Sequence, residues 1–198
     1  VNQAFADCFA QLPRLAPYLH LPVQSGSDRV LAEMRRGYTA AEYLAKLEML
    51  RNSRFDIALT ADIIVGYPGE TEAEFEETCR LVEQARFDGL FVFLYSPRPG
   101  TTAARLTDDV PEEEKKRRFR VLNEQQQRYQ RENNRRRVGS IEEVVIEEIG
   151  AEDFSGRTPQ FRLVHTPLPH GRTLKVGERV NVQITDAFPN SLRGRFTG

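Results

Sequence analysis

The stretch from Leu59 to Thr71 constrains the fold of this chain more than any other. Its first part is short, apolar and rich in β-branched residues, which is typical of a strand buried on both faces. Gly66-Tyr67-Pro68-Gly69 then forms a turn, and Thr71 followed by Glu74 is a capping box. A capping box predicts the start of a helix. A buried strand that leads directly into a helix is typical of parallel βα units.

Asp62 interrupts the apolar part of this strand. A buried carboxylate without a partner is very costly in free energy. We therefore expect Asp62 to be hydrogen-bonded, paired with a cation or turned toward a ligand.

The alternation of strands and helices extends over the first part of the chain. Apolar periodicity and turn residues predict helices at 5–16, 28–36, 39–53 and 71–86, and strands at 18–24, 59–65 and 90–95. A long polar helix is predicted from Pro111 to about Arg137. Its first turn is acidic and the remainder basic, so it presents either a solvated face or an edge that contacts phosphates.

The pattern changes after Gly139. Short strands are predicted at 141–149, 160–165, 179–185 and 192–196, and Gly and Pro clusters separate them. Short strands at this spacing indicate a small antiparallel barrel. We therefore expect an α/β fold with two domains, a parallel half-barrel over 1–137 and a small β-barrel over 138–198.

Charge and cysteine usage limit the function classes. The 28 basic and 29 acidic residues give a net charge of −1, so the chain as a whole has no attraction for nucleic acid and a basic surface must be local. No stretch is long and apolar enough to span a membrane. Cys8 and Cys79 lie far apart without CxxC spacing, which predicts free buried thiols rather than a metal site. We expect a cytoplasmic protein without a membrane partner.

Polar residues follow each of the three predicted parallel strands. They are Gln24, Ser25 and Gly26 after the first strand, Asp62 and the turn from Gly66 to Glu70 at the second, and Tyr95 and Ser96 at the third. Function gathers at the carboxyl ends of parallel strands, so these groups are expected to share one cleft. Gln24 and Asp62 are suited to sugar hydroxyls, and Arg36 to a carboxylate.

Purely structural roles remain possible for several of these residues. The glycine turn serves equally as a plain link between strand and helix, His20 as a satisfied core histidine and Glu70 as a cap of its own helix. The residues contain no Ser-His-Asp order, no metal-ligand spacing and no carboxylate pair placed for acid–base work. The residues alone therefore predict a polar cleft, but they do not indicate which reaction takes place there.

Five sequence blocks resemble the radical SAM methylthiotransferases, in the order of that family. The blocks span residues 20–28 (HLPVQSGSD), 34–39 (MRRGYT), 62–71 (DIIVGYPGET), 95–101 (YSPRPGT) and 189–194 (PNSLRG). Within that family, the sequence is most similar to the enzymes that add a methylthio group to C2 of an isopentenylated adenosine beside the tRNA anticodon. Other branches act on threonylcarbamoyl-adenosine tRNA or on a ribosomal protein, and these remain alternatives.

The resemblance implies a fold, a cofactor and an RNA partner. It implies the C-terminal part of a partial TIM-like (β/α) barrel, followed by an OB-like TRAM barrel that binds tRNA. The residues that match the family's S-adenosylmethionine (SAM) site are Gln24, Ser25, Arg36, Asp62, Gly66, Pro68, Glu70, Tyr95 and Ser96. The expected RNA-binding residues are Arg136, Arg137, Arg157, Arg162, Asn190 and Arg193. Phe154, Phe161 and Phe188 are available for base stacking, although small barrels usually need such rings in the core.

The resemblance also implies two [4Fe-4S] clusters, whose cysteine motifs Cys8 and Cys79 do not match. The chain starts at Val1 in what reads as the middle of a domain, so we expect a piece of a longer enzyme with the cluster ligands upstream. We expect this piece to be inactive alone, with a non-catalytic RNA-binding module as the remaining alternative. The sulfur donor is not indicated.

Overall fold

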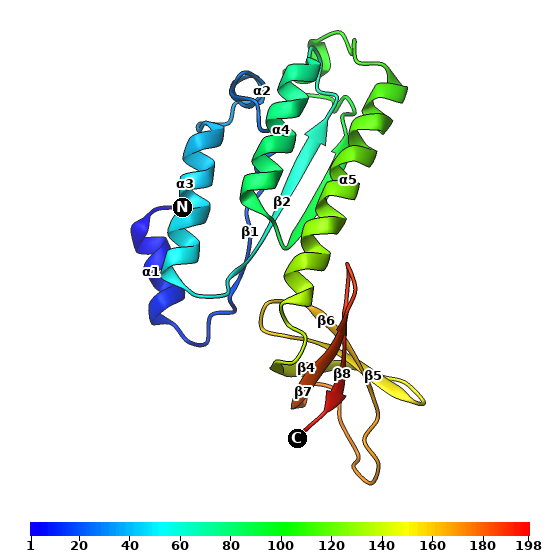
Figure 1. The fold of residues 1–198 in the computed structure, drawn as a ribbon. Helices are drawn as coiled ribbons and strands as arrows, with labels where there is room; N and C mark the ends of the chain where they lie inside the picture. Colours follow the sequence, from blue (N-terminus) through cyan, green and yellow to red (C-terminus); the bar gives the residue numbers. More distant parts are fainter.

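A computed structural model describes all 198 residues and divides them into an α/β unit and a barrel. In the α/β unit, helices α1 (Gln3–Gln11), α2 (Asp28–Glu33), α3 (Ala40–Ser53) and α4 (Glu72–Ala85) alternate with strands β1 (Tyr18–His20), β2 (Ala58–Val65) and β3 (Gly89–Leu94). The 3₁₀ helix η1 (Ala103–Arg105) precedes α5 (Glu112–Arg135), which runs down to the barrel (Figure 1).

The sheet has the order β1-β2-β3, and both neighbouring pairs are parallel as predicted. The predicted capping boxes are confirmed, because Thr39 caps α3 with Glu42 and Thr71 caps α4 with Glu74. The first strand is shorter than predicted. Past Pro22 the chain regains only one bridge to β2, between Gln24 and Ile63.

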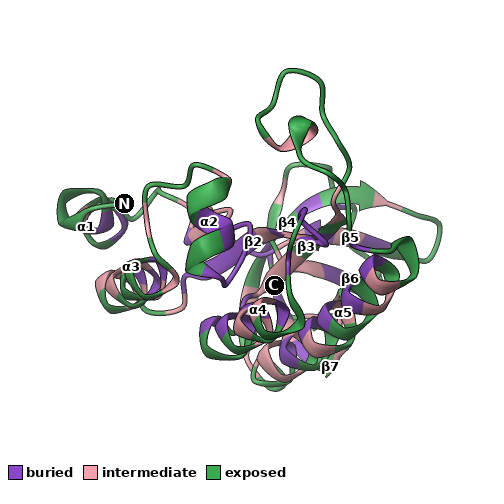
Figure 2. Cartoon of the chain, turned by 90° about the horizontal axis from the view of Figure 1, so that it is seen from above, coloured by how far each residue is buried: buried purple, intermediate pink, exposed green.

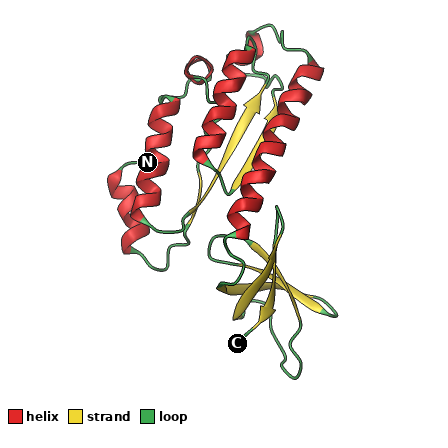
Figure 3. Cartoon of the chain, in the orientation of Figure 1, coloured by secondary structure: helices red, strands yellow, loops and turns green.

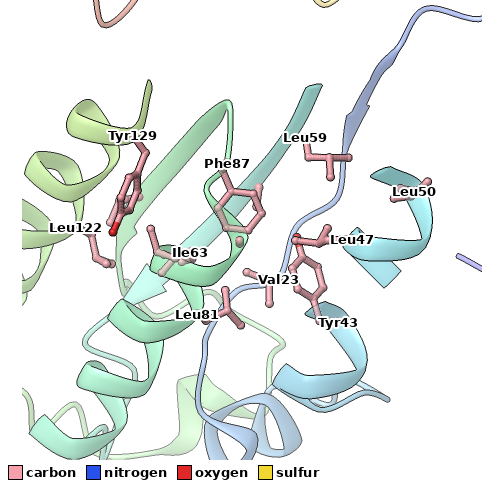
Figure 4. Packing of buried hydrophobic residues seen from close by; sticks show 14 of the residues in the cluster. Val23, Tyr43, Leu47, Leu50, Leu59, Ile63, Leu81, Phe87, Leu122 and Tyr129 are labelled. Carbon is pink, nitrogen blue, oxygen red and sulfur yellow. The ribbon is translucent and has the colours of Figure 1, made fainter. Parts of the chain in front are cut away.

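Helices cover only one face of this sheet. Figure 2 shows α4 and α5 together on one side of β2 and β3, and Figure 4 shows the core packed between the strands and α3, α4 and α5. Leu59, Ala61 and Ile63 point into this core and are fully buried. The expectation of a strand buried on both faces is wrong for its second half, because Asp62 and Ile64 lie on the other face and are half-exposed. That open face carries polar groups.

The barrel contains only strands and loops (Figure 3). Its strands β4 (Ile141–Ile149), β5 (Asp153–Arg157), β6 (Leu163–Pro167), β7 (Arg179–Ala187) and β8 (Leu192–Phe196) close in the order β4-β5-β6-β8-β7. Only the β6–β8 pair is parallel. The predicted small barrel is confirmed, but β5 was missed and the strand predicted at 160–165 begins at Leu163. Glycine is required in β5, because a Cβ on Gly156 would lie 2.2 Å from the carbonyl oxygen of Val145.

The two units meet through part-buried polar contacts. Arg162 of the barrel pairs with Asp88 at 2.6 Å and donates to Asn134 Oδ1 at 2.9 Å, and Arg137 pairs with Asp56. Asn134, near the end of α5, donates to the carbonyl oxygens of residues 188 and 189 in the barrel. These contacts set the barrel against the lower end of the α/β unit. The predicted division at residue 138 falls between α5 and β4.

Candidate functional site

A cavity of about 680 Å³ lies at the carboxyl ends of the three parallel strands. Its wall includes five residues that the sequence placed there, namely Gln24, Arg36, Asp62, Tyr95 and Ser96. The volume lies within the range of about 300–1,000 Å³ that is usual for small-molecule sites. Parallel order brings these residues together, because all three strands end at the same edge of the sheet.

Gln24 is fixed in the wall by its backbone. Its N–H donates to the carbonyl oxygen of Asp62 and its own carbonyl accepts from Ile64, both at 2.9 Å. The residue has a φ of 80°, a left-handed conformation that is uncommon for a residue with a side chain. Such strain persists only where the surrounding structure enforces it, and it is frequent at functional sites.

Asp62 is turned toward the open face of the sheet, where a chain of polar groups holds it. Its Oδ1 lies 3.3 Å from Nε2 of His20, and Nδ1 of His20 lies 2.9 Å from Oγ1 of Thr60. The hydroxyl of Tyr18 lies 3.2 Å from the same Oγ1. The reading of His20 as a core residue is therefore wrong, because its side chain is 37% exposed and orients a carboxylate of the cavity.

The cavity carries more positive charge than the sequence indicated. Arg35, Arg36 and Arg98 all line it, and none of them forms an ion pair. Glu33 also lines the cavity, but it is paired with Arg29 at 2.8 Å. Three guanidinium groups without a carboxylate partner suit an anionic ligand. Sequence reasoning missed Arg35, and it placed Arg98 at the cleft only as part of the loop that follows the third strand.

Aromatic rings form another part of the wall. The rings of Tyr67 and Tyr95 lie 5.5 Å apart, at 72° to one another. Burial raises the pKa of both phenols, so both stay neutral at physiological pH. The Tyr95 hydroxyl donates to the carbonyl of Ala103, which ties the loop to the cavity. Tyr67 was expected at the cleft only as part of the turn from Gly66 to Glu70, and its ring was not singled out.

The other turn residues support the site from outside the cavity. Gly66 has a φ of 73°, and a Cβ there would lie 2.3 Å from Cγ of Lys115. Glu70 is buried, accepts from the N–H of Gly66 at 2.6 Å and pairs with Arg118 at 2.8 Å. Burial raises the pKa of Glu70, although these hydrogen bonds oppose the shift. The turn is thereby tied to α5.

Ser25, Gly66, Pro68 and Glu70 do not line the cavity. Ser25 is buried and accepts from the N–H of Ser27. A direct role for these four residues in binding a ligand stays a prediction. The hydrogen bonds and the ion pair of Ser25, Gly66 and Glu70 hold the chain in place outside the cavity.

The six residues expected to bind RNA fall into two groups. Arg136, Asn190 and Arg193 are exposed, and neither of these two arginines forms an ion pair. Arg137 and Arg162 instead join the two units, and Arg157 pairs with Glu147 at 3.1 Å. An RNA-contacting role for all six stays a prediction, and the exposed group is the better placed for phosphates.

The two thiols do not form a cluster site. Cys8 is exposed, contrary to the sequence expectation, and Cys79 is half-buried. Burial raises the pKa of Cys79 to about 11. No three histidine, cysteine or acidic side chains gather in an arrangement that holds a metal ion. None of the helices has the length and apolar character needed to cross a membrane.

Comparisons with known proteins match both units. The family model of the radical SAM superfamily matches residues 5–82, and that of the TRAM domain matches residues 135–197. A solved structure titled as coproporphyrinogen III oxidase from Escherichia coli, a radical SAM enzyme, has a TM-score of 0.55 over 93% of this chain and 44% of its own. Its sequence is 18% identical, so this likeness shows the fold alone.

Curated relatives match nearly the whole chain. The tRNA-2-methylthio-N(6)-dimethylallyladenosine synthases of Chromobacterium violaceum and Methylococcus capsulatus are 47% and 45% identical over 98% and 100% of this chain. The synthase of Alkalilimnicola ehrlichii is 46% identical over 100% of it. The chain spans less than half of these relatives, covering 44%, 43% and 44% of their lengths.

Proposed function

The chain belongs to the radical SAM methylthiotransferase family, and from this premise we propose that it is the SAM-binding and tRNA-binding part of an enzyme that methylthiolates tRNA. The proposed reaction adds a methylthio group to C2 of an isopentenylated adenosine next to the anticodon. The observation that carries the proposal is the 45% to 47% identity to tRNA-2-methylthio-N(6)-dimethylallyladenosine synthases, which extends over both units.

The residues of the cavity fit SAM. The methionine end of SAM carries a carboxylate, and the unpaired guanidinium of Arg36 supplies a partner for it. Gln24 and Asp62 supply an amide and a carboxylate for the two ribose hydroxyls. Tyr95 and Ser96 form the wall on which we place the adenine, with the turn from Gly66 to Glu70 behind it. A ribose bound in this way explains why Asp62 lies on the uncovered face of the sheet.

This chain binds and orients the cofactor in the proposed enzyme. When bound, SAM supplies the sulfonium whose reductive cleavage starts the reaction, with electrons from a [4Fe-4S] cluster. We place the ligands of the two proposed clusters outside these 198 residues, because Cys8 and Cys79 do not match the cysteine motifs of the family. The chain alone is therefore expected to be inactive.

The barrel is proposed to hold the tRNA. Arg136 and Arg193 are exposed and unpaired, as phosphate contacts require. The net charge of −1 means that such binding depends on a local patch and falls with added salt.

Nucleoside mass spectrometry tests the proposed reaction. Full-length protein, reconstituted anaerobically with iron and sulfide, is incubated with SAM and with tRNA that either carries or lacks the isopentenyl group. We expect a methylthio group only on the isopentenylated nucleoside, and a loss of product in Asp62→Asn but not in the exposed control Glu48→Gln. Modification of threonylcarbamoyl-adenosine or of a ribosomal protein instead would assign the chain to another branch. Tight tRNA binding without any product would favour a non-catalytic RNA-binding module.

A further inference from the structure

A second, smaller hollow lies where the α/β unit meets the barrel. This interdomain crevice has a volume of about 240 Å³. The starts of the three parallel strands form one wall, and the β5–β6 loop forms the other. Asn190 and Ser191, from the family-like block at 189–194, also line it. It lies at the opposite end of the strands from the SAM cavity.

Phe161 is held in the crevice against its conformational preference. Its φ of 63° is left-handed, which is a genuine outlier for a bulky residue. Its N–H donates to the carbonyl of Thr158, and its own carbonyl accepts from Arg157 at 2.9 Å. The ring lies 4.7 Å from that of Tyr18, yet Phe161 remains 51% exposed. The expectation of a core ring is wrong here, because a left-handed backbone places this aromatic side chain at the surface, and such strain is frequent at functional sites.

Two buried polar atoms on the same loop have no partner. They are Oε1 of Gln160, an acceptor, and Nε of Arg162, a donor. The remaining polar atoms of both side chains are fixed, because Gln160 Nε2 donates to Asp56 at 2.9 Å and Arg162 bonds to Asp88 and Asn134. An unsatisfied buried group costs free energy, so such a pair requires an explanation such as a water or a ligand.

We propose that the interdomain crevice binds one unpaired nucleobase of the RNA. The base stacks on Phe161, and its entry uncovers Gln160 Oε1, which accepts from its polar edge, and Arg162 Nε, which donates to it. A nucleobase fits because it combines a flat π face with a donor and an acceptor on one edge. The inference rests on the proposed function for its RNA partner, and it adds a base-reading site distinct from the SAM cavity.

Fluorescence with a labelled RNA tests the site. The probe is an anticodon stem-loop RNA in which each unpaired loop base is replaced in turn by 2-aminopurine, titrated with the full 198-residue chain. We expect stacking to quench one position strongly. Phe161→Leu should remove that quenching and weaken binding by about tenfold. The dependence of affinity on salt should stay unchanged, because no phosphate contact is lost.

Phe188→Leu is the matched control. Phe188 is also on the barrel and is 47% exposed, but it does not line the crevice. We expect it to leave quenching and affinity unchanged, and thermal melting establishes that both variants are folded. Equal losses in the two variants would place the stacking elsewhere and overturn the proposal. Unchanged quenching and affinity in Phe161→Leu would also overturn the proposal. Failure of the unmodified chain to bind RNA at low salt would instead refute the RNA partner of the proposed function.

Discussion

Replacing Arg118 by Met tests how the glycine turn is held behind the SAM cavity. Arg118 and Glu70 form an ion pair at 2.8 Å, with side chains only 5% and 1% exposed. Oε1 of Glu70 has no partner at all, so Arg118 and the N–H of Gly66 alone satisfy this carboxylate. Arg118→Met leaves a buried charge without its cation. Breaking such a pair costs about 3–5 kcal/mol.

The cost is expected to depend on pH. Burial already raises the pKa of Glu70, and the loss of Arg118 removes one of the interactions that oppose this shift. The pKa therefore rises further in the variant. A carboxyl group whose pKa is higher in the folded state than in the unfolded state loses stability as the pH rises through the folded pKa. The destabilisation by Arg118→Met should be larger at about pH 8 than at about pH 5, because a higher folded-state pKa brings Glu70 closer to protonation as the pH falls.

Chemical and thermal unfolding measure this effect. For a chain of this size, about 3–5 kcal/mol corresponds to a fall in Tm of roughly 6–20 °C. Arg120→Met, an exposed and unpaired arginine on the same helix, is the control and should change stability little. The double variant Glu70→Gln with Arg118→Met should lose less than Arg118→Met alone. A cost below about 1 kcal/mol at pH 8, or the same cost at both pH values, would refute the reasoning.

Three further outcomes are expected. In urea unfolding, Gly66→Ala should destabilise the chain by more than Gly100→Ala. Both glycines have a positive φ, but only at Gly66 would the new methyl group clash with a neighbour. Equal losses of stability would show that the clash has no energetic effect. Arg162→Met should loosen the barrel from the α/β unit, which small-angle scattering reports as a larger radius of gyration; an unchanged radius would mean that this pair is dispensable for domain orientation. At pH 8, a disulfide reagent should modify Cys8 quickly and Cys79 slowly, because burial raises the pKa of Cys79 to about 11; equal rates would contradict that burial.

Local patterns were sufficient to predict the scaffold of the α/β unit. Capping boxes at Thr39 and Thr71 marked two helix starts, because their side-chain contacts span only three residues. Gln24, Asp62 and Tyr95 could be placed together, because parallel strands align their ends. By contrast, β5 was missed because its sequence, DFSGR, lacks β-branched residues, and its glycine is needed for close packing against β4.

The contacts between the two units could not be predicted from local sequence patterns. Arg162 and Asp88 are separated by 74 residues, so the pairing follows from the tertiary arrangement alone. The guanidinium of Arg162 therefore looked available for RNA in the sequence, whereas the structure uses it to fix the barrel. The exposure of Phe161 was hidden for the same reason, since aromatic residues of small barrels are usually in the core. Phe154, the third such ring, is in the core as expected.

Calorimetric titration of SAM into the 198-residue chain tests most directly whether the cavity at the strand ends is a SAM site. Asp62→Asn removes a charge from the cavity wall with little change in shape, and Glu48→Gln does the same on an exposed helix surface. We expect weak, saturable binding to the unmodified chain, because the proposed cluster that would hold the methionine end is not supplied by these residues. Asp62→Asn should weaken that binding by about tenfold, as the loss of one charged hydrogen bond predicts, and Glu48→Gln should not change it. Equal SAM affinity in all three proteins would contradict the assignment of Asp62 and of the cavity.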